Sequence, residues 1–215
     1  MKTTETNQQV VSLKGEVVHL QSEMSSKMQP LIDSVVRMET TVQQLQEGFG
    51  EMALMVQTLQ ATSYSGTFIW KIPEVQRRRG EARSGRTVSL YSAPFYTSRH
   101  GYKMCLRLYM DGDGSGKGTH FSFFLTLMRG ECDTLLPWPF DQEFQLILVD
   151  QEKQGRDCIH IFKPDPDMPS FQEPSPHSDM NIASGCPKFA PLSVLDNPAY
   201  IKDDTMILKC KILAS

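Results

Sequence analysis

Residues 102–110 alternate between two kinds of side chain, as expected for a strand with one buried face. One face carries a cation beside an aromatic ring, because Arg107 lies two residues before Tyr109. This pair suits a carboxylate-bearing peptide, since a charge-assisted hydrogen bond from a guanidinium contributes about 1.5–3 kcal/mol. A solvated arginine beside a surface tyrosine is the alternative. The other face is expected to lie in the core and consists of Tyr102, Met104, Leu106, Leu108 and Met110.

The segment that follows, residues 111–119, is rich in Gly and Asp. It does not match a phosphate-binding loop, because Gly118 stands where a magnesium-binding hydroxyl is needed and the glycine spacing is one residue short. It does not match a calcium loop either, because its twelfth position is Ser122 rather than Glu. We therefore predict a glycine-rich hairpin. Its exposed Asp and glycines would still let a ligand backbone come close.

The sequence contains no recognised catalytic or metal-binding pattern. There is no H-E-x-x-H pair, no G-x-S-x-G segment and no protease-like cysteine signature. The five cysteines are widely spaced and never form C-x-x-C, so we expect reduced thiols rather than a disulfide framework or a zinc site. These patterns predict a protein that is not an enzyme and needs no cofactor or metal.

Charge and hydropathy narrow the class of partner. The formal net charge of the 215 residues is -3, which gives no basic field to attract nucleic acid or an anionic membrane. The basic run at 77–79 is expected to be a solvated loop. The N-terminus lacks the apolar stretch of a signal peptide, and no run approaches the roughly 18 apolar residues of a membrane span. We expect a cytoplasmic protein without nucleic-acid partners or membrane insertion.

The elements that position Arg107 and Tyr109 are expected to be strands. From residue 64 onward the apolar period is two, and loops rich in Gly, Pro, Asp and Ser separate the candidates. Without helical crossovers, short strands favour an antiparallel sandwich, so residues 64–215 are predicted to form one all-β domain. The candidate strands are 67–72, 87–91, 102–110, 120–128, 144–150, 159–162 and 205–213.

Residues 1–63 have a different period. Their apolar residues recur at alternating gaps of three and four, which predicts an α-helical coiled coil. A single helix packed on a globular core is the alternative. The seam expected to hold an oligomer together begins near Met28 and contains Leu31, Val35, Met38, Val42, Leu45, Phe49, Met52, Val56 and Leu59.

The first part of this region is less regular. An earlier stripe ends at Met24 and shifts register before Met28, which is a stutter, and Pro30 follows it. An interior proline costs about 3 kcal/mol, so we expect a break or kink near residues 24–30 and a regular coiled coil over 31–60. The small and apolar flanks of the seam permit a trimer but leave a dimer open.

Several long segments resemble the C-terminal domain, called TRAF-C or MATH, of the TNF receptor-associated factor (TRAF) family. The resemblance covers about residues 64–213 and favours the receptor-binding branch. It implies an antiparallel sandwich of about eight strands, a preceding coiled coil and a parallel trimer. The segments are 68–72 (FIWKI), 91–97 (YSAPFYT), 101–107 (GYKMCLR), 112–114 (GDG), 118–120 (GTH), 135–140 (LLPWPF), 180–187 (MNIASGCP) and 200–205 (YIKDDT).

The resemblance also implies roles for individual residues. Arg107 and Tyr109 match the pair that holds an acidic residue of a receptor tail, with Asp113 and Gly114 beside them. Ala183, Ser184 and Gly185 match the contacts to a peptide that adds as an extra strand. The apolar pocket for a small residue of the motif is matched by Phe124, Leu146, Phe162, Phe171 and Cys186.

One stretch departs from the family pattern. The receptor-binding branch has three consecutive serines before the pocket phenylalanine, and this chain has Met168, Pro169 and Ser170 before Phe171. Two hydroxyls that would bind a Gln or Glu of the motif are therefore replaced. At about 1 kcal/mol for each hydrogen bond, the preference at that ligand position is expected to relax by about 1–2 kcal/mol.

These observations together predict a trimeric cytoplasmic adaptor that binds acidic motifs in the tails of TNF-receptor-superfamily members and regulates NF-κB and apoptosis signalling. Homotrimers, or heterotrimers with other TRAF proteins, are the expected assemblies, and related adaptors are expected partners. This chain shows no RING or zinc fingers, so no ubiquitin-ligase activity is expected of it. Two alternatives stay open: an oligomerising scaffold or dominant-negative subunit, and a MATH-type substrate-recognition module of the ubiquitin system.

Overall fold

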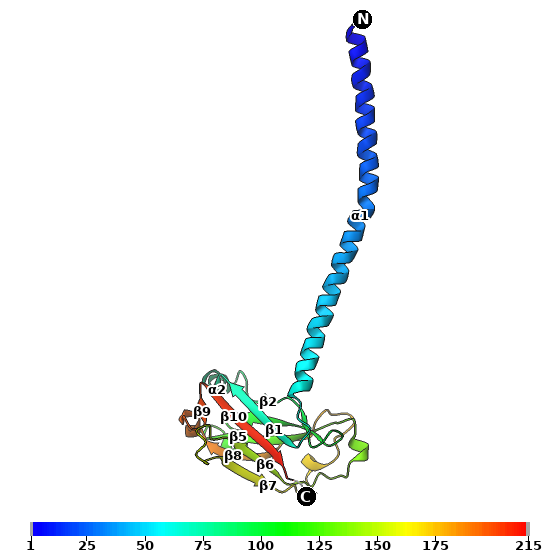
Figure 1. Cartoon of the computed structure of the whole chain (residues 1–215). Coiled ribbons are helices and arrows are strands. Elements are labelled where there is room, and N and C mark those ends of the chain that lie inside the picture. The colour runs from blue at the N-terminus through cyan, green and yellow to red at the C-terminus, as the bar shows by residue number, and fades with distance from the viewer. Residues whose placement is uncertain (1, 214–215) are drawn as a thin grey trace. The chain divides into compact units, whose positions relative to one another are not determined.

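A computed structural model describes residues 2–213, and within the long helix it describes the side chains of residues 11, 13–49 and 52. The chain divides into two compact units, 1–57 and 58–215. The first is part of a helix and the second contains every strand of the described chain (Figure 1). Within residues 2–213, no helix is both long enough and apolar enough to cross a membrane.

Helix α1 (Lys2–Ala61) is continuous and includes Pro30. A break or kink was expected near residues 24–30, and the helix is not broken there. A proline removes one hydrogen bond and bends a helix, but the turns on both sides keep their own bonds, and Figure 1 shows α1 changing direction part of the way along its length. The predicted seam is exposed: Leu31 is 66% and Phe49 67% accessible. The side chains of Val56 and Leu59 lie outside the described residues.

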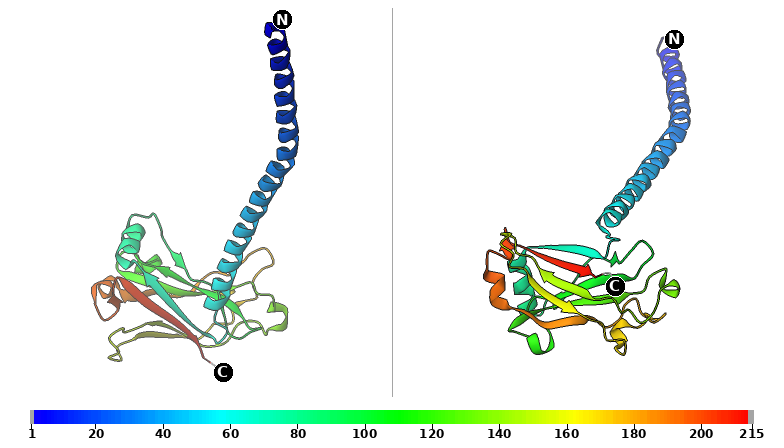
Figure 2. Two further views of the ribbon diagram at one scale, coloured as in Figure 1. Left: turned by 45° about the horizontal axis from the view of Figure 1, so that its top comes forward. Right: turned by 60° about the horizontal axis from the view of Figure 1, so that its bottom comes forward.

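The second unit is the predicted antiparallel sandwich, built from two sheets of five strands (Figure 2). The first sheet has the order β1 (Thr67–Pro73), β10 (Thr205–Ile212), β6 (Phe144–Leu148), β7 (Cys158–Phe162), with β9 (Ile201–Lys202) also on β10. The second has the order β2 (Leu90–Tyr91), β4 (Lys103–Tyr109), β5 (His120–Met128), β8 (Ser184–Pro191), with β3 (Phe95–Tyr96) also on β4.

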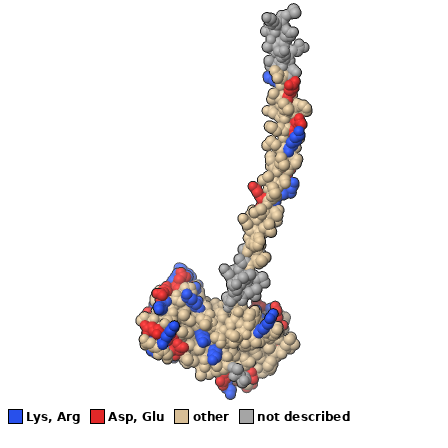
Figure 3. Space-filling model, viewed as in Figure 1, with Lys and Arg blue, Asp and Glu red and all other residues tan. Residues whose placement is uncertain are grey.

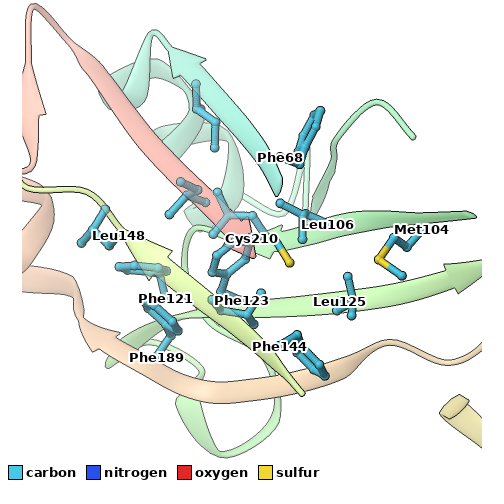
Figure 4. Packing of buried hydrophobic residues seen from close by; sticks show 14 of the residues in the cluster. Phe68, Met104, Leu106, Phe121, Phe123, Leu125, Phe144, Leu148, Phe189 and Cys210 are labelled. Atoms are coloured by element: carbon cyan, nitrogen blue, oxygen red, sulfur yellow. The ribbon is translucent and has the colours of Figure 1, made fainter. Parts of the chain in front are cut away.

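Alternation along the strands fills the space between the sheets. Figure 4 shows Phe121, Phe123 and Leu125 of β5 meeting Phe144 of β6 and Cys210 of β10. All five are at most 2% exposed. The apolar set predicted for residues 102–110 is also buried, which confirms the face that was expected to lie inward. The core thus fixes which side chains of β4 point outward.

The structure contains strands that the sequence did not predict. β8 follows Ala183 and includes Gly185 and Pro187, residue types that usually indicate a loop. A strand tolerates proline where one of its sides has no ladder partner, and β8 ends its sheet. The two-residue strands β3 and β9 were also missed, and the expected strand 87–91 is reduced to Leu90–Tyr91.

Helix α2 (Val75–Arg83) replaces the loop that was expected at the basic run 77–79. Its N-terminus is capped from elsewhere in the sequence, because Gln76 N donates to Asp204 Oδ1 over 3.0 Å. Arg77 pairs with Glu81, and Arg79 pairs with Asp196. Figure 3 shows acidic and basic side chains mixed at the end of the sandwich that carries α2. On the face shown, charges of the two signs are interspersed at that end.

Short 3-10 turns complete the fold. Two of them, η1 and η3, lie in segments expected to contact a peptide. The 3-10 turns of the described chain are η1 (Gly114–Gly116), η2 (Asp133–Leu135), η3 (Pro169–Phe171) and η4 (Leu192–Asp196).

Candidate peptide-binding site

A row of residues crosses the whole outer face of the second sheet. The strand registers place Tyr91 of β2 opposite Arg107 of β4, Arg107 opposite Phe124 of β5, and Phe124 opposite Gly185 of β8. Three strand spacings cover roughly 14 Å. The row therefore joins the predicted acid-binding arginine to the edge strand β8, although these residues are far apart in the sequence.

Arg107 is the half-buried centre of this row. Its guanidinium carbon lies 4.7 Å from the ring centroid of Tyr109 and 4.9 Å from that of Tyr91. Its Nε donates to Ser89 Oγ over 3.2 Å. A cation over an aromatic face is attracted by the ring quadrupole, so the two rings and the serine hydroxyl together restrict the side chain. The alternative of an arginine extended freely into solvent does not describe this geometry.

Tyr109 is more buried than the sequence suggested. Its side chain was placed on the open face, but the residue is only 7% exposed because Arg107 lies over its ring and Phe124 packs edge-on against it at 5.8 Å. Burial raises the pKa of the phenol above its ordinary value, while the charge of Arg107 acts in the opposite direction. The hydroxyl is therefore a neutral hydrogen-bond donor at neutral pH.

Cys105, two residues before Arg107, was also expected on the open face. It is 2% exposed, and burial raises the pKa of its thiol to about 11. Its cross-strand neighbour Thr126 is 1% exposed. The period of two placed Cys105 on the same face as Arg107, but it could not show that Cys105 is buried. All five cysteines are free thiols, as predicted.

The glycine-rich segment 111–119 is the predicted hairpin between β4 and β5. Gly112 has φ +76°, and a Cβ there would lie 2.2 Å from Gly116 O, so only glycine fits. Ser122 ties the hairpin to β8: Asp113 N donates to Ser122 Oγ over 2.7 Å, and that hydroxyl donates to Pro187 O over 2.6 Å. Asp113 is exposed, and Gly114 begins η1 beside it.

Strand β8 pairs with β5 on one side and, in the part of the chain described, with no strand on the other. Its far half is tied to β7, where His160 Nε2 lies 3.0 Å from Phe189 O. The near half, Ser184 to Cys186, is half-buried. Gly185 leaves no room for a side chain, since a Cβ would lie 2.5 Å from Phe123 O. This stretch is an unpaired edge of the kind that accepts an added strand.

The predicted apolar pocket residues come from both sheets and from the 3-10 turn η3. Phe124, Leu146 and Phe171 are 8%, 0% and 4% exposed, whereas Phe162 and Cys186 are half-buried. Phe162 stacks on Phe144 at 5.1 Å, and Phe171 also lies beside Phe144. Leu146 is completely covered in the core. Its contact with a ligand, like the rest of the pocket, stays a prediction.

Ser170 lies in η3, next to the segment that leads into β8. The side-chain amide of Asn181 connects the two, donating to Ser170 O over 3.3 Å and to Gln172 O over 2.7 Å. Asn181 was not predicted as a site residue. It precedes Ala183 by two positions and fixes η3 against the strand edge.

Two further residues at the site were missed. Tyr91 and Ser89 contact Arg107 but lie in the segment before β4, and only the β2–β4 register brings them together. The indication in the sequence was that residues 87, 89 and 91 are alternate residues of the expected strand 87–91 and would therefore share one face. The described residues contain no group of three or more His, Cys, Asp or Glu arranged to hold a metal ion.

Comparison with known proteins agrees with this architecture. The TRAF/meprin, MATH domain family model matches residues 87–209, which is more than half of the chain. A solved structure of Notothenia coriiceps TRAF5 superposes with a TM-score of 0.75 at 36% identity, covering 90% of this chain and 95% of that one. The residues that it shares with this chain therefore include the sandwich described above.

The curated relatives of this chain are also TNF receptor-associated factors. The chain is 53% identical over 159 residues to TNF receptor-associated factor 1 of Homo sapiens, covering 73% of this chain and 38% of the relative. It is 42% identical over 209 residues to TNF receptor-associated factor 2 of Homo sapiens, covering 93% and 41%. The chain spans less than half the length of these relatives. The chain belongs to the TRAF family and contains its MATH domain.

Proposed function

We propose that this chain is an oligomeric cytoplasmic adaptor whose sandwich binds short acidic peptide segments in the tails of TNF-receptor-superfamily members. The observation that carries the proposal is the row from Gly185 through Phe124 to Arg107, which connects an unpaired strand edge to a guanidinium. The names of the relatives, TNF receptor-associated factors, supply the class of partner. Binding, rather than catalysis, is the activity.

The peptide would add to β8 along Ser184 to Cys186. Backbone hydrogen bonds would supply sequence-independent affinity, and its side chains would reach the outer face of the sheet. An acidic residue would meet Arg107 and the neutral hydroxyl of Tyr109, with Asp113 and Gly114 in the adjoining β4–β5 hairpin. Ser170 would bind a polar side chain, and the apolar group around Phe124, Phe162 and Cys186 would hold a small residue.

Helix α1 would bring several peptide-binding sites together in one oligomer. Its apolar stripe is about half exposed or more from Leu31 to Met52, so the helix needs partners to cover it. Three parallel helices would carry three binding heads, in a homotrimer or in a heterotrimer with other TRAF proteins. Each head would bind weakly, and together they would gain about 10²–10⁴ in apparent affinity on clustered receptors. Clustering would couple binding to NF-κB and apoptosis signalling.

The test is titration of a labelled acidic tail peptide against the full chain and against Arg107→Ala. We expect at least about 10-fold weaker binding, because a charge-assisted bond is lost, and a further loss with Tyr109→Phe, which keeps the ring. Lys209→Ala is the matched control, since Lys209 is a cation on the outer face of the other sheet. Equal affinity of the wild type, Arg107→Ala and Lys209→Ala proteins would reject the site.

An oligomerising scaffold or dominant-negative subunit is the second candidate. The exposed stripe of α1 favours it, because association through α1 does not require the sandwich to bind anything. Normal hetero-oligomer formation together with no peptide binding at any tested concentration would support this function instead.

A further inference from the structure

We propose that Tyr91 and Ser89 are positioning residues for Arg107, and that they make the site selective for a carboxylate. This inference rests on the proposed function and extends the site one strand beyond the residues that the sequence predicted. Tyr91 lies on β2, at the end of the cross-strand row opposite to β8.

The first step is the restriction of the guanidinium. Arg107 lies over two ring faces from two different strands, Tyr109 on its own strand and Tyr91 on its neighbour. Phe124 also packs edge-on against the Tyr109 ring. Tyr91 is directly opposite Arg107 in the strand register. A rotation of the guanidinium away from this position would lose both ring contacts.

The second step concerns the hydrogen bonds. The Nε of Arg107 is occupied by Ser89 Oγ at 3.2 Å. Within the described residues, its terminal nitrogens Nη1 and Nη2 form no ion pair or hydrogen bond to a carboxylate. The ring contacts fix the plane and the serine fixes the rotation, so these two nitrogens are the donors available to a ligand.

The third step concerns the ligand group that the two terminal nitrogens of Arg107 recognise. Two parallel N–H donors match the two oxygens of a carboxylate, whereas a side-chain amide offers one acceptor and its own N–H groups. A guanidinium that is already oriented loses less freedom on binding, so the gain falls on ligands with the matching geometry. A lysine cannot reproduce it, because its ammonium is a point charge without a plane.

The rival explanation is purely structural: Tyr91 packs β2 onto β4 and nothing more. Its side chain is exposed, with 46% of the residue accessible, so it contributes little to the core. Leu90, the preceding residue, is the one that packs against the buried cluster. The exposure of Tyr91 leaves its ring free to act on Arg107 and on a ligand beside it.

The experiment is a double-mutant cycle with two peptides that differ only by Glu or Gln at the acidic position. Tyr91→Leu should weaken binding of the Glu peptide by about 5- to 10-fold and leave the Gln peptide within about 2-fold. Tyr91→Phe keeps the ring and should match the wild type. Ser89→Ala should weaken the Glu peptide by about 3-fold. In the Arg107→Ala background, Tyr91→Leu should have no further effect.

Equal weakening of both peptides, or an additional loss in the Arg107→Ala background, would overturn the positioning role while leaving the proposed function intact. If Arg107→Ala itself binds like the wild type, the proposed function fails first. A readout without peptide separates the two cases: the NMR signal of the Arg107 Nε–H group should shift and sharpen in Tyr91→Leu but not in Tyr91→Phe. An unchanged signal would reject the contact. Tyr91→Thr, a strand-compatible truncation, replaces Tyr91→Leu if that variant does not fold.

Discussion

Helix α1 and the β-sandwich use apolar residues in opposite ways. On α1, the stripe residues Leu31, Leu45 and Phe49 are 57–67% exposed. In the sandwich, Phe123 and Phe144 are completely buried. The sandwich covers its apolar surface with its own chain, whereas the stripe of α1 is exposed over its described residues, and in the proposed oligomer partner helices would cover it. The stability of the sandwich and association through α1 should therefore respond to different substitutions.

The largest effect is expected from the helix. Glutamate at Val42, Leu45 and Phe49 places charges in the seam and should prevent association, so apparent affinity for an array of tethered acidic peptides should fall by about 10²–10⁴-fold. Binding of one peptide in solution should not change. Sedimentation and surface binding measure the two quantities. Glutamate at Thr40, Gln43 and Gln44, which lie off the seam, is the control. Equal array binding by both variants would contradict a role for the seam.

The next effect is internal to the sandwich. Phe123→Ala should lower the free energy of unfolding by about 3–5 kcal/mol, because it leaves a cavity between the sheets. Urea unfolding of the sandwich in the full chain, followed by the fluorescence of Trp70 and Trp138, measures the change. Ile69→Ala is the matched control, since Ile69 is 63% exposed on β1, and it should cost less than about 1 kcal/mol. Similar losses for the two variants would erase the distinction between inner and outer faces.

Alkaline pH should weaken the sandwich through Cys105. Burial raises the pKa of this thiol to about 11 from an ordinary value of 9.0, so the unfolded chain loses the proton first. The stability associated with Cys105 is complete below about pH 9 and is lost as pH rises to about 11, by about 2–3 kcal/mol. Urea unfolding across this range should be less steeply pH-dependent in Cys105→Ala. Cys132→Ala, at a half-buried site, should keep the wild-type dependence; an unchanged slope in both variants would refute the assignment.

The smallest effect is expected from loss of the N-terminal cap of helix α2. Helix α2 begins with a cap in which Asp204 Oδ1 accepts a hydrogen bond from Gln76 N, and Asp204 lies in the β9–β10 turn with φ +52°. Asp204→Gly accepts this backbone conformation but removes the cap, and should cost about 1 kcal/mol of unfolding free energy. Asp204→Asn keeps an acceptor oxygen and should cost less. If Gly and Asn are equally stable by urea unfolding, the cap does not stabilise α2.

Prediction from the sequence succeeded where the pattern repeats along the chain. The strands containing Ile72, Leu106 and Phe123 were found because a period of two persisted over five or more residues. It failed where short elements depend on distant partners. β8 contains a glycine and a proline that indicate a loop, and α2 lacks an amphipathic pattern and a local cap.

The same difference applies to the candidate site. Alternation placed Arg107 and Tyr109 on one face, and the structure agrees that they are side by side. The depth of Tyr109 and the contact with Tyr91 were not predictable, because both depend on which strand lies beside β4 and in which register.

The sequence alone therefore determined that the N-terminal region is helical, that the region after it is an antiparallel sandwich, and which residues of β4 face outward. These properties follow from local periodicity and backbone geometry. Only the tertiary structure decided that Tyr91, Arg107, Phe124 and Gly185 form one row, and that Asp204 starts a helix far from it in sequence. Both arrangements arise from strand pairing across long separations, which neighbouring residues along the chain do not encode.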